Sequence, residues 1–112
     1  MMQVPASGLF KIAVVALLAG GAQSAFAQGD LERGRQLAEQ ACSRCHATGP
    51  DGESRHEDAP AFRDLNKRYP VNDLEEALGE GIVTGHPDMP EISFPPDDAA
   101  ALIDYMISIQ ER

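Results

Sequence analysis

The segment Cys42-Ser43-Arg44-Cys45-His46 constrains this chain more than any other feature. Two cysteines separated by two residues can each form a thioether with a vinyl group of haem, and the histidine that follows can place a ring nitrogen on the iron. These are the only cysteines, and they lie too close in sequence to join distant parts of a fold as a disulfide. The motif therefore predicts one covalently attached haem, with Cys42 and Cys45 as attachment points and His46 as an axial iron ligand.

Two other uses of a Cys-x-x-Cys pair fit the sequence less well. A structural zinc site needs four ligands, and the chain has no second cysteine pair. A dithiol redox motif is expected beside a βαβ pattern, which the sequence lacks.

Residues 1–27 have the pattern of a secretory signal peptide. Lys11 precedes an apolar run, and Ala25-Phe26-Ala27 offers small residues at both positions that a signal peptidase reads. We expect cleavage before Gln28, which leaves residues 28–112 as one domain in the periplasm with no stable membrane insertion. An uncleaved anchor is the alternative, but the apolar stretch has 11 residues, against the roughly 20 that span a bilayer as a helix.

Residues 28–112 are strongly acidic. Lys11 is the only charged side chain before them, so they hold 8 of the 9 basic and all 18 acidic side chains, a formal charge of −10. This charge repels nucleic-acid phosphates and attracts a positively charged protein face. It also favours solubility. The sequence therefore predicts no nucleic-acid partner, and basic docking faces on the redox proteins that meet this chain.

Hydrophobic periodicity predicts an all-α domain of three to five helices. The first helix covers residues 30–41, with Asp30 as its N-cap. A short helix follows over residues 62–69, and Asn72 caps a third. No repeat and no alternating strand pattern interrupts this order.

The last helix is expected to open at Asp97 and Asp98. Apolar residues at the spacing of a buried helical stripe follow, namely Ala99, Leu102, Ile103, Met106 and Ile107. Two loops separate the helices, a polar surface loop over residues 48–60 and a stiff loop over residues 84–96 that contains four prolines.

The sixth ligand of the iron decides between electron transfer and gas binding. The candidates after residue 27 are Met89, Met106, His56 and His86. Met106 falls on the apolar stripe, where methionine usually fills the core, and His56 falls in a charged loop. Met89 stands in the proline-rich loop, and a thioether on a rigid loop suits a redox site. We therefore predict Met89 as the ligand, with His86 as its competitor.

The motifs and their order resemble the class I c-type cytochromes, the small monohaem cytochrome c family, over nearly all of residues 28–112. Typical of that family are a glycine eight residues before the first cysteine, here Gly34, and leucine and tyrosine three apart in the last helix, here Leu102 and Tyr105. A methionine loop precedes that helix, here Gly85-His86-Pro87-Asp88-Met89-Pro90. The resemblance implies that the first and last helices cross at Gly34 and wrap, with the others, around one haem.

The resemblance also implies further contacts with the haem. A proline carbonyl usually accepts a hydrogen bond from the second ring nitrogen of the ligand histidine, and Pro60 matches that position better than Pro50. Tyr69 matches the residue that binds a haem propionate, since the chain has no tryptophan, although packing at a helix end is its alternative role. Further candidates for the propionates are Arg55, Arg63 and Arg68.

The expected function is the carriage of single electrons between redox proteins, with haem c and its iron as cofactor and no substrate transformed. Two alternatives stay open at this point. One is a gas-ligand sensor or peroxidase-like catalyst with a labile sixth position, which substitution of Met89 would hardly change. The other is a dedicated cytochrome subunit of a periplasmic dehydrogenase, which an exposed apolar patch would favour.

Overall fold

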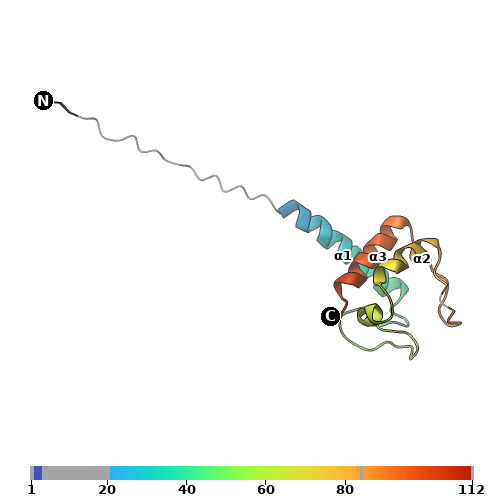
Figure 1. Ribbon diagram of the computed structural model, residues 1–112. Coiled ribbons are helices and arrows are strands. Elements are labelled where there is room, and N and C mark those ends of the chain that lie inside the picture. Colours follow the sequence, from blue (N-terminus) through green and yellow to red (C-terminus); the bar gives the residue numbers. More distant parts are fainter. Residues whose placement is uncertain (1, 4–20, 84, 112) are drawn as a thin grey trace.

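The computed structural model describes residues 2–3, 21–83 and 85–111, and they form a helical domain (Figure 1). The elements are α1 (Gly21–Ala41), the 3-10 helices η1 (Phe62–Lys67) and η2 (Val71–Asp73), α2 (Leu74–Glu80) and α3 (Pro96–Ser108). Over these residues no strand forms, and an isolated antiparallel bridge pairs Ile82 with Ile92. The expected all-α architecture is confirmed.

Helix α1 begins nine residues before the predicted start, so Asp30 lies inside the helix and does not cap it. Residues 21–29 include three alanines and two glutamines, which have high helix propensity and allow the helix to extend backwards. The expected signal peptide lies largely outside the described residues, because residues 4–20 are not among them.

The predicted cap at Asn72 is also wrong. Asn72 lies within η2, and the N-cap of α2 is Asp73, which makes no side-chain capping bond. Val71 is 2% exposed, and its burial draws the chain after Pro70 into a tight 3-10 turn before the α-helix begins. Helix α2 ends at Glu80, and its C-cap is Gly81, whose φ of 111° favours glycine over any residue with a side chain.

Helix α3 begins at Pro96, one residue before the predicted start, with Asp97 and Asp98 in its first turn. Four of the five predicted stripe residues are buried, but Ile107 is 44% exposed. The buried face of α3 includes the side that faces α1, so Ala101 and Tyr105 are buried although the stripe did not contain them.

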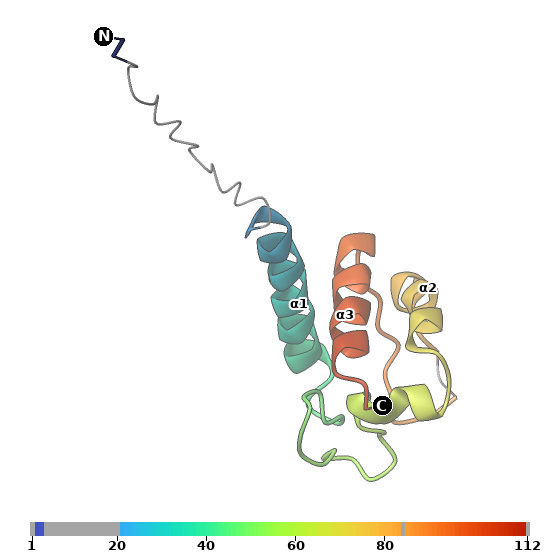
Figure 2. The ribbon, with the colours of Figure 1, turned by 60° about the vertical axis from the view of Figure 1, so that its left-hand side comes forward.

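Helices α1 and α3 lie side by side in both views (Figures 1 and 2). They meet at Gly34, where an added Cβ would lie 2.6 Å from the Cβ of Tyr105 and would also overlap the carbonyl oxygen of Ala101. Arg33 and Asp98 join the same helices through two hydrogen bonds of 3.1 Å. The predicted contact between the first and last helices at Gly34 is confirmed.

The core lies between α1, α3 and the shorter helices. Its buried members are Leu37, Ala38, Phe62, Leu65, Val71, Leu78, Ala99, Leu102, Ile103, Tyr105 and Met106. Gln110 closes the C-terminal end of this core, because its side-chain amide donates to the carbonyl of Phe62 at 2.6 Å. Among the described helices, none has both the length and the apolar character needed to cross a membrane.

Candidate functional site

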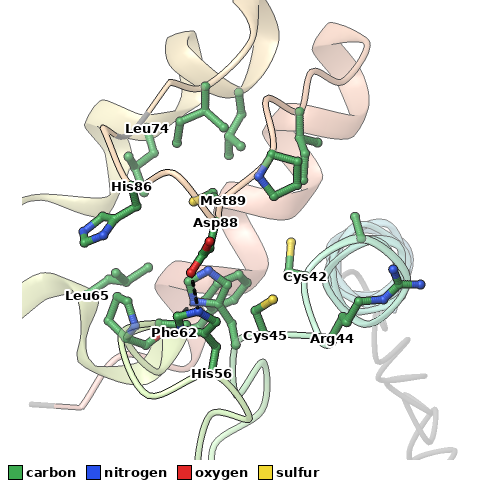
Figure 3. A pocket seen from close by; sticks show the side chains of 18 of the residues that line it. Cys42, Arg44, Cys45, His56, Phe62, Leu65, Leu74, His86, Asp88 and Met89 are labelled. Atoms are coloured by element: carbon green, nitrogen blue, oxygen red, sulfur yellow. Dashed lines mark hydrogen bonds and ion pairs between the residues drawn. The ribbon is translucent and has the colours of Figure 1, made fainter.

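The Cys42–His46 segment continues the winding of α1 by one more turn. The amide of Cys42 donates to the carbonyl of Ala38 at 2.9 Å, and the amide of His46 donates to the carbonyl of Cys42 at 2.9 Å. Because a helical turn gathers side chains three and four residues apart on one side, both thiols and the imidazole lie together. Figure 3 shows the two cysteines beside a cavity that all three residues line.

The ring of His46 is held by the backbone. Its Nδ1 lies 2.7 Å from the carbonyl oxygen of Pro60, and a carbonyl can only accept a hydrogen bond, so Nδ1 carries the proton. The lone pair of the neutral ring is therefore on Nε2, the nitrogen available to a metal. The ring of Phe62 lies 5.1 Å away, tilted by 44°, and limits rotation of the imidazole.

The cavity has a volume of about 550 Å³ and is bordered by α1, η1, α2, α3 and the loop before α3. Much of its wall is apolar, including Leu65, Leu74, Leu78, Ile92, Phe94 and Leu102. Two thiols, three imidazoles and two thioether groups line this one space. That combination of donors and apolar wall fits a haem attached through two cysteines.

Met89 also lines the cavity, and its side chain is half-buried (Figure 3). It ends a turn in which its amide donates to the carbonyl of His86 at 3.2 Å, with Pro87 and Asp88 as the central residues. The three other candidate ligands line the same cavity, namely Met106, His56 and His86. Met106 is 3% exposed and packs in the core, as its place on the apolar stripe predicted.

Tyr69 lines the cavity and is 41% exposed, so it stands where the cavity reaches the surface. The three arginines proposed for the propionates do not border this cavity. Arg55 and Arg63 line a neighbouring polar hollow, and Arg63 donates to the carbonyl of Gly52 at 2.6 Å. Arg44, inside the haem motif, is the arginine on the cavity wall.

Burial raises the pKa of the Cys42 thiol to about 11. The thiol is therefore protonated at neutral pH and behaves as a small apolar group in the cavity wall. Neither cysteine forms a disulfide in this structure.

Several residues that build the site were not found by sequence reasoning. The hydroxyl of Ser54 accepts a hydrogen bond from the amide of Ala47 at 2.9 Å, and buried Thr48 accepts one from the hydroxyl of Tyr105 at 2.6 Å. His56 bonds to Asp88 across the cavity mouth. These contacts join residues that are far apart in the chain or lie within an irregular loop. No periodicity or sequence motif predicts such contacts.

One comparison with known proteins gave a match. A family model described as "Cytochrome C oxidase, cbb3-type, subunit III" matches residues 29–106. The comparisons with curated proteins and with solved structures gave no match. The matched region contains the Cys42–His46 segment and Met89, implies covalently bound haem c with its iron, and supports a role in electron transfer. The chain therefore belongs to this family, whose domain is a class I c-type cytochrome.

Proposed function

We propose that this chain is an exported carrier of single electrons in which His46 and Met89 are the axial iron ligands and Cys42 and Cys45 form the thioethers. The observation that carries the proposal is that one cavity gathers these four side chains, with the tautomer of His46 set for metal binding. When bound, the haem supplies an iron that changes between the ferric and ferrous states.

The chain holds both proposed ligands in place during that change. Pro60 orients the imidazole through its carbonyl, which also raises the basicity of Nε2. Met89 is the last residue of a hydrogen-bonded turn that contains proline, so its backbone has little freedom to rearrange. A site that moves little when its charge changes transfers electrons with a small reorganisation cost.

Met89 is favoured over Met106 by its position. Met106 belongs to the rigid core of α3, where its side chain packs among buried residues at 3% exposure. Met89 comes from a loop whose ends are joined by the Ile82–Ile92 bridge, and its side chain lines the cavity. Binding of its thioether to the iron therefore removes no side chain from the hydrophobic core.

Most of the net negative charge of the chain lies in the segment that contains the proposed ligand loop. Residues 70–111 hold ten aspartates and glutamates and neither lysine nor arginine. This segment contains α2, the Met89 loop and α3. A redox partner with a basic docking face would therefore be drawn towards this side of the domain.

The proposal includes two finer points. Tyr69, at the edge of the cavity, donates its hydroxyl proton in a hydrogen bond to a haem propionate. Residues 1–27 act as the signal peptide, so the mature protein starts at Gln28 in the periplasm; the mass of the purified holoprotein tests this start site directly.

Two matched substitutions test the choice of ligand. We expect Met89→Leu to abolish the weak sulfur-to-iron charge-transfer band of the ferric protein and to let carbon monoxide bind the ferrous protein. Met106→Leu, a swap of similar volume in the core, should leave both properties as in the wild type. If Met106→Leu abolishes the band and Met89→Leu keeps it, the ligand assignment is wrong.

A further inference from the structure

His56 makes hydrogen bonds that the proposed function does not use. Its amide donates to the carbonyl of Cys45 at 3.1 Å. Its Nδ1 lies 3.1 Å from the amide nitrogen of Asp58, and its Nε2 lies 3.1 Å from Oδ2 of Asp88. Residues on both sides of the cavity mouth are thereby connected through one imidazole (Figure 3).

The contact with Asp58 defines the tautomer of His56. A backbone amide can only donate, so Nδ1 of His56 accepts and has a lone pair. The proton of the neutral ring is then on Nε2, which donates to the carboxylate of Asp88. The hydrogen bond from the amide of Asp58 therefore leaves Nε2 of His56 as a donor that faces the Met89 loop.

Asp88 is the residue immediately before Met89. It occupies the centre of the turn closed by the hydrogen bond from the amide of Met89 to the carbonyl of His86. The Ile82–Ile92 bridge fixes the base of this loop, and the bond from His56 reaches its tip. Restraint of the Asp88 side chain therefore restrains the backbone that presents the Met89 thioether.

We propose that His56 and Asp88 form a clasp that keeps Met89 on the iron, with His56 as a positioning residue for the sixth ligand. This inference rests on the proposed function, because it takes Met89 as that ligand. The clasp anchors the Met89 loop to the segment that follows the haem motif, since His56 is itself bonded to the carbonyl of Cys45. It therefore sets how often the sixth position opens, and with it the access of small ligands to the iron.

The side chains of Asp88 and His56 are 74% and 31% exposed, so water competes for their hydrogen bond. A solvent-exposed hydrogen bond to a carboxylate lies at the weak end of the range for such bonds. We therefore expect loss of the clasp to raise the apparent affinity of the ferrous protein for carbon monoxide by about threefold to tenfold. Complete loss of Met89 ligation is not expected.

A double-mutant cycle on the holoprotein tests the clasp. The affinity for carbon monoxide and the strength of the sulfur-to-iron band are measured for His56→Ala, Asp88→Ala and the double variant. The two single variants should each raise the affinity, and the double variant should raise it no further than either one. Asp88→Asn, whose amide oxygen still accepts from Nε2, should stay closer to the wild type than Asp88→Ala.

Glu75→Ala is the matched control. It removes an exposed carboxylate of the same acidic segment that makes no ion pair within the described residues, and it should leave the affinity unchanged. Single variants with wild-type affinity, or effects that add in the double variant, would overturn the clasp. Absence of the sulfur-to-iron band in the wild type would instead overturn Met89 ligation, so the two failures are distinguishable.

Discussion

Gly34 on α1 lies directly against the backbone carbonyl of Ala101 on α3, with no room between them for a side chain. This contact sets the distance between the two helices. Cys42 follows eight residues later, about 12 Å further along the helix axis at the usual rise per residue. The close approach at Gly34 therefore places the haem motif beside the end of α3 that carries Met106.

Gly34→Ala is expected to lower the free energy of unfolding by about 3 kcal/mol, because the new methyl group meets a backbone atom that cannot move without shifting a helix. Gly79→Ala is the matched control. Gly79 also lies in a helix, but nothing is within 4 Å of its added Cβ, so alanine should stabilise the protein by up to about 1 kcal/mol. Equal effects from urea denaturation of the two variants would contradict the close contact.

Tyr105→Phe is expected to cost about 1–2 kcal/mol of stability at neutral pH. The change removes the hydrogen bond of 2.6 Å to the carbonyl of buried Thr48 and leaves that acceptor without its partner. Tyr105→Leu would remove the ring as well, so the phenylalanine variant isolates the hydroxyl. Denaturation curves at pH 7 measure the difference, and a change below about 0.3 kcal/mol would argue against this bond.

The same tyrosine predicts a dependence of stability on alkaline pH. Burial raises the pKa of Tyr105 above its ordinary value of 10.0. The unfolded chain then loses this proton at a lower pH than the folded protein does. The stabilisation is therefore complete below about pH 10 and is lost as the pH rises through the folded pKa. Tyr105→Phe should decline less steeply above pH 10 than the wild type, and parallel declines would contradict the assignment.

The haem attachment site, the four candidate ligands and the helices could be predicted from the sequence, because each is recognised by the spacing of residues close together in the chain. Cys42 and His46 lie on the same side of a helical turn whatever the tertiary structure around it. The apolar residues from Ala99 to Met106 likewise share one face of α3, and that face is buried when the helix packs against the core. The start of α1 was not predictable from Asp30, since a capping residue inside a segment of strong helix formers is overridden by propagation of the helix.

The remaining errors concern tertiary contacts. Ile107 fits the apolar pattern of α3, but the angle at which α3 meets α1 leaves it at the surface. The bond between His56 and Asp88 joins two loops 32 residues apart, and no local rule relates such loops. Arg44 lines the cavity, which its place inside the haem motif did not indicate.

The acidic segment predicts opposite salt dependences for two small oxidants of opposite charge. Reaction of the ferrous protein with a cationic cobalt complex should slow as ionic strength rises, whereas reaction with ferricyanide should accelerate. Replacing Glu75, Glu76 and Glu80 on α2 by glutamine should reduce both dependences. Stopped-flow rates between 10 mM and 500 mM salt provide the test, and equal dependences for the two oxidants would contradict an acidic face near the haem.

The optical spectrum of the wild-type holoprotein, ferric and ferrous, with and without carbon monoxide, tests the central claim most directly. Ligation by His46 and Met89 predicts a low-spin haem with the weak sulfur-to-iron charge-transfer band and little response to the gas. A high-spin haem that binds carbon monoxide readily would contradict the account and would favour gas binding or catalysis at an open sixth position.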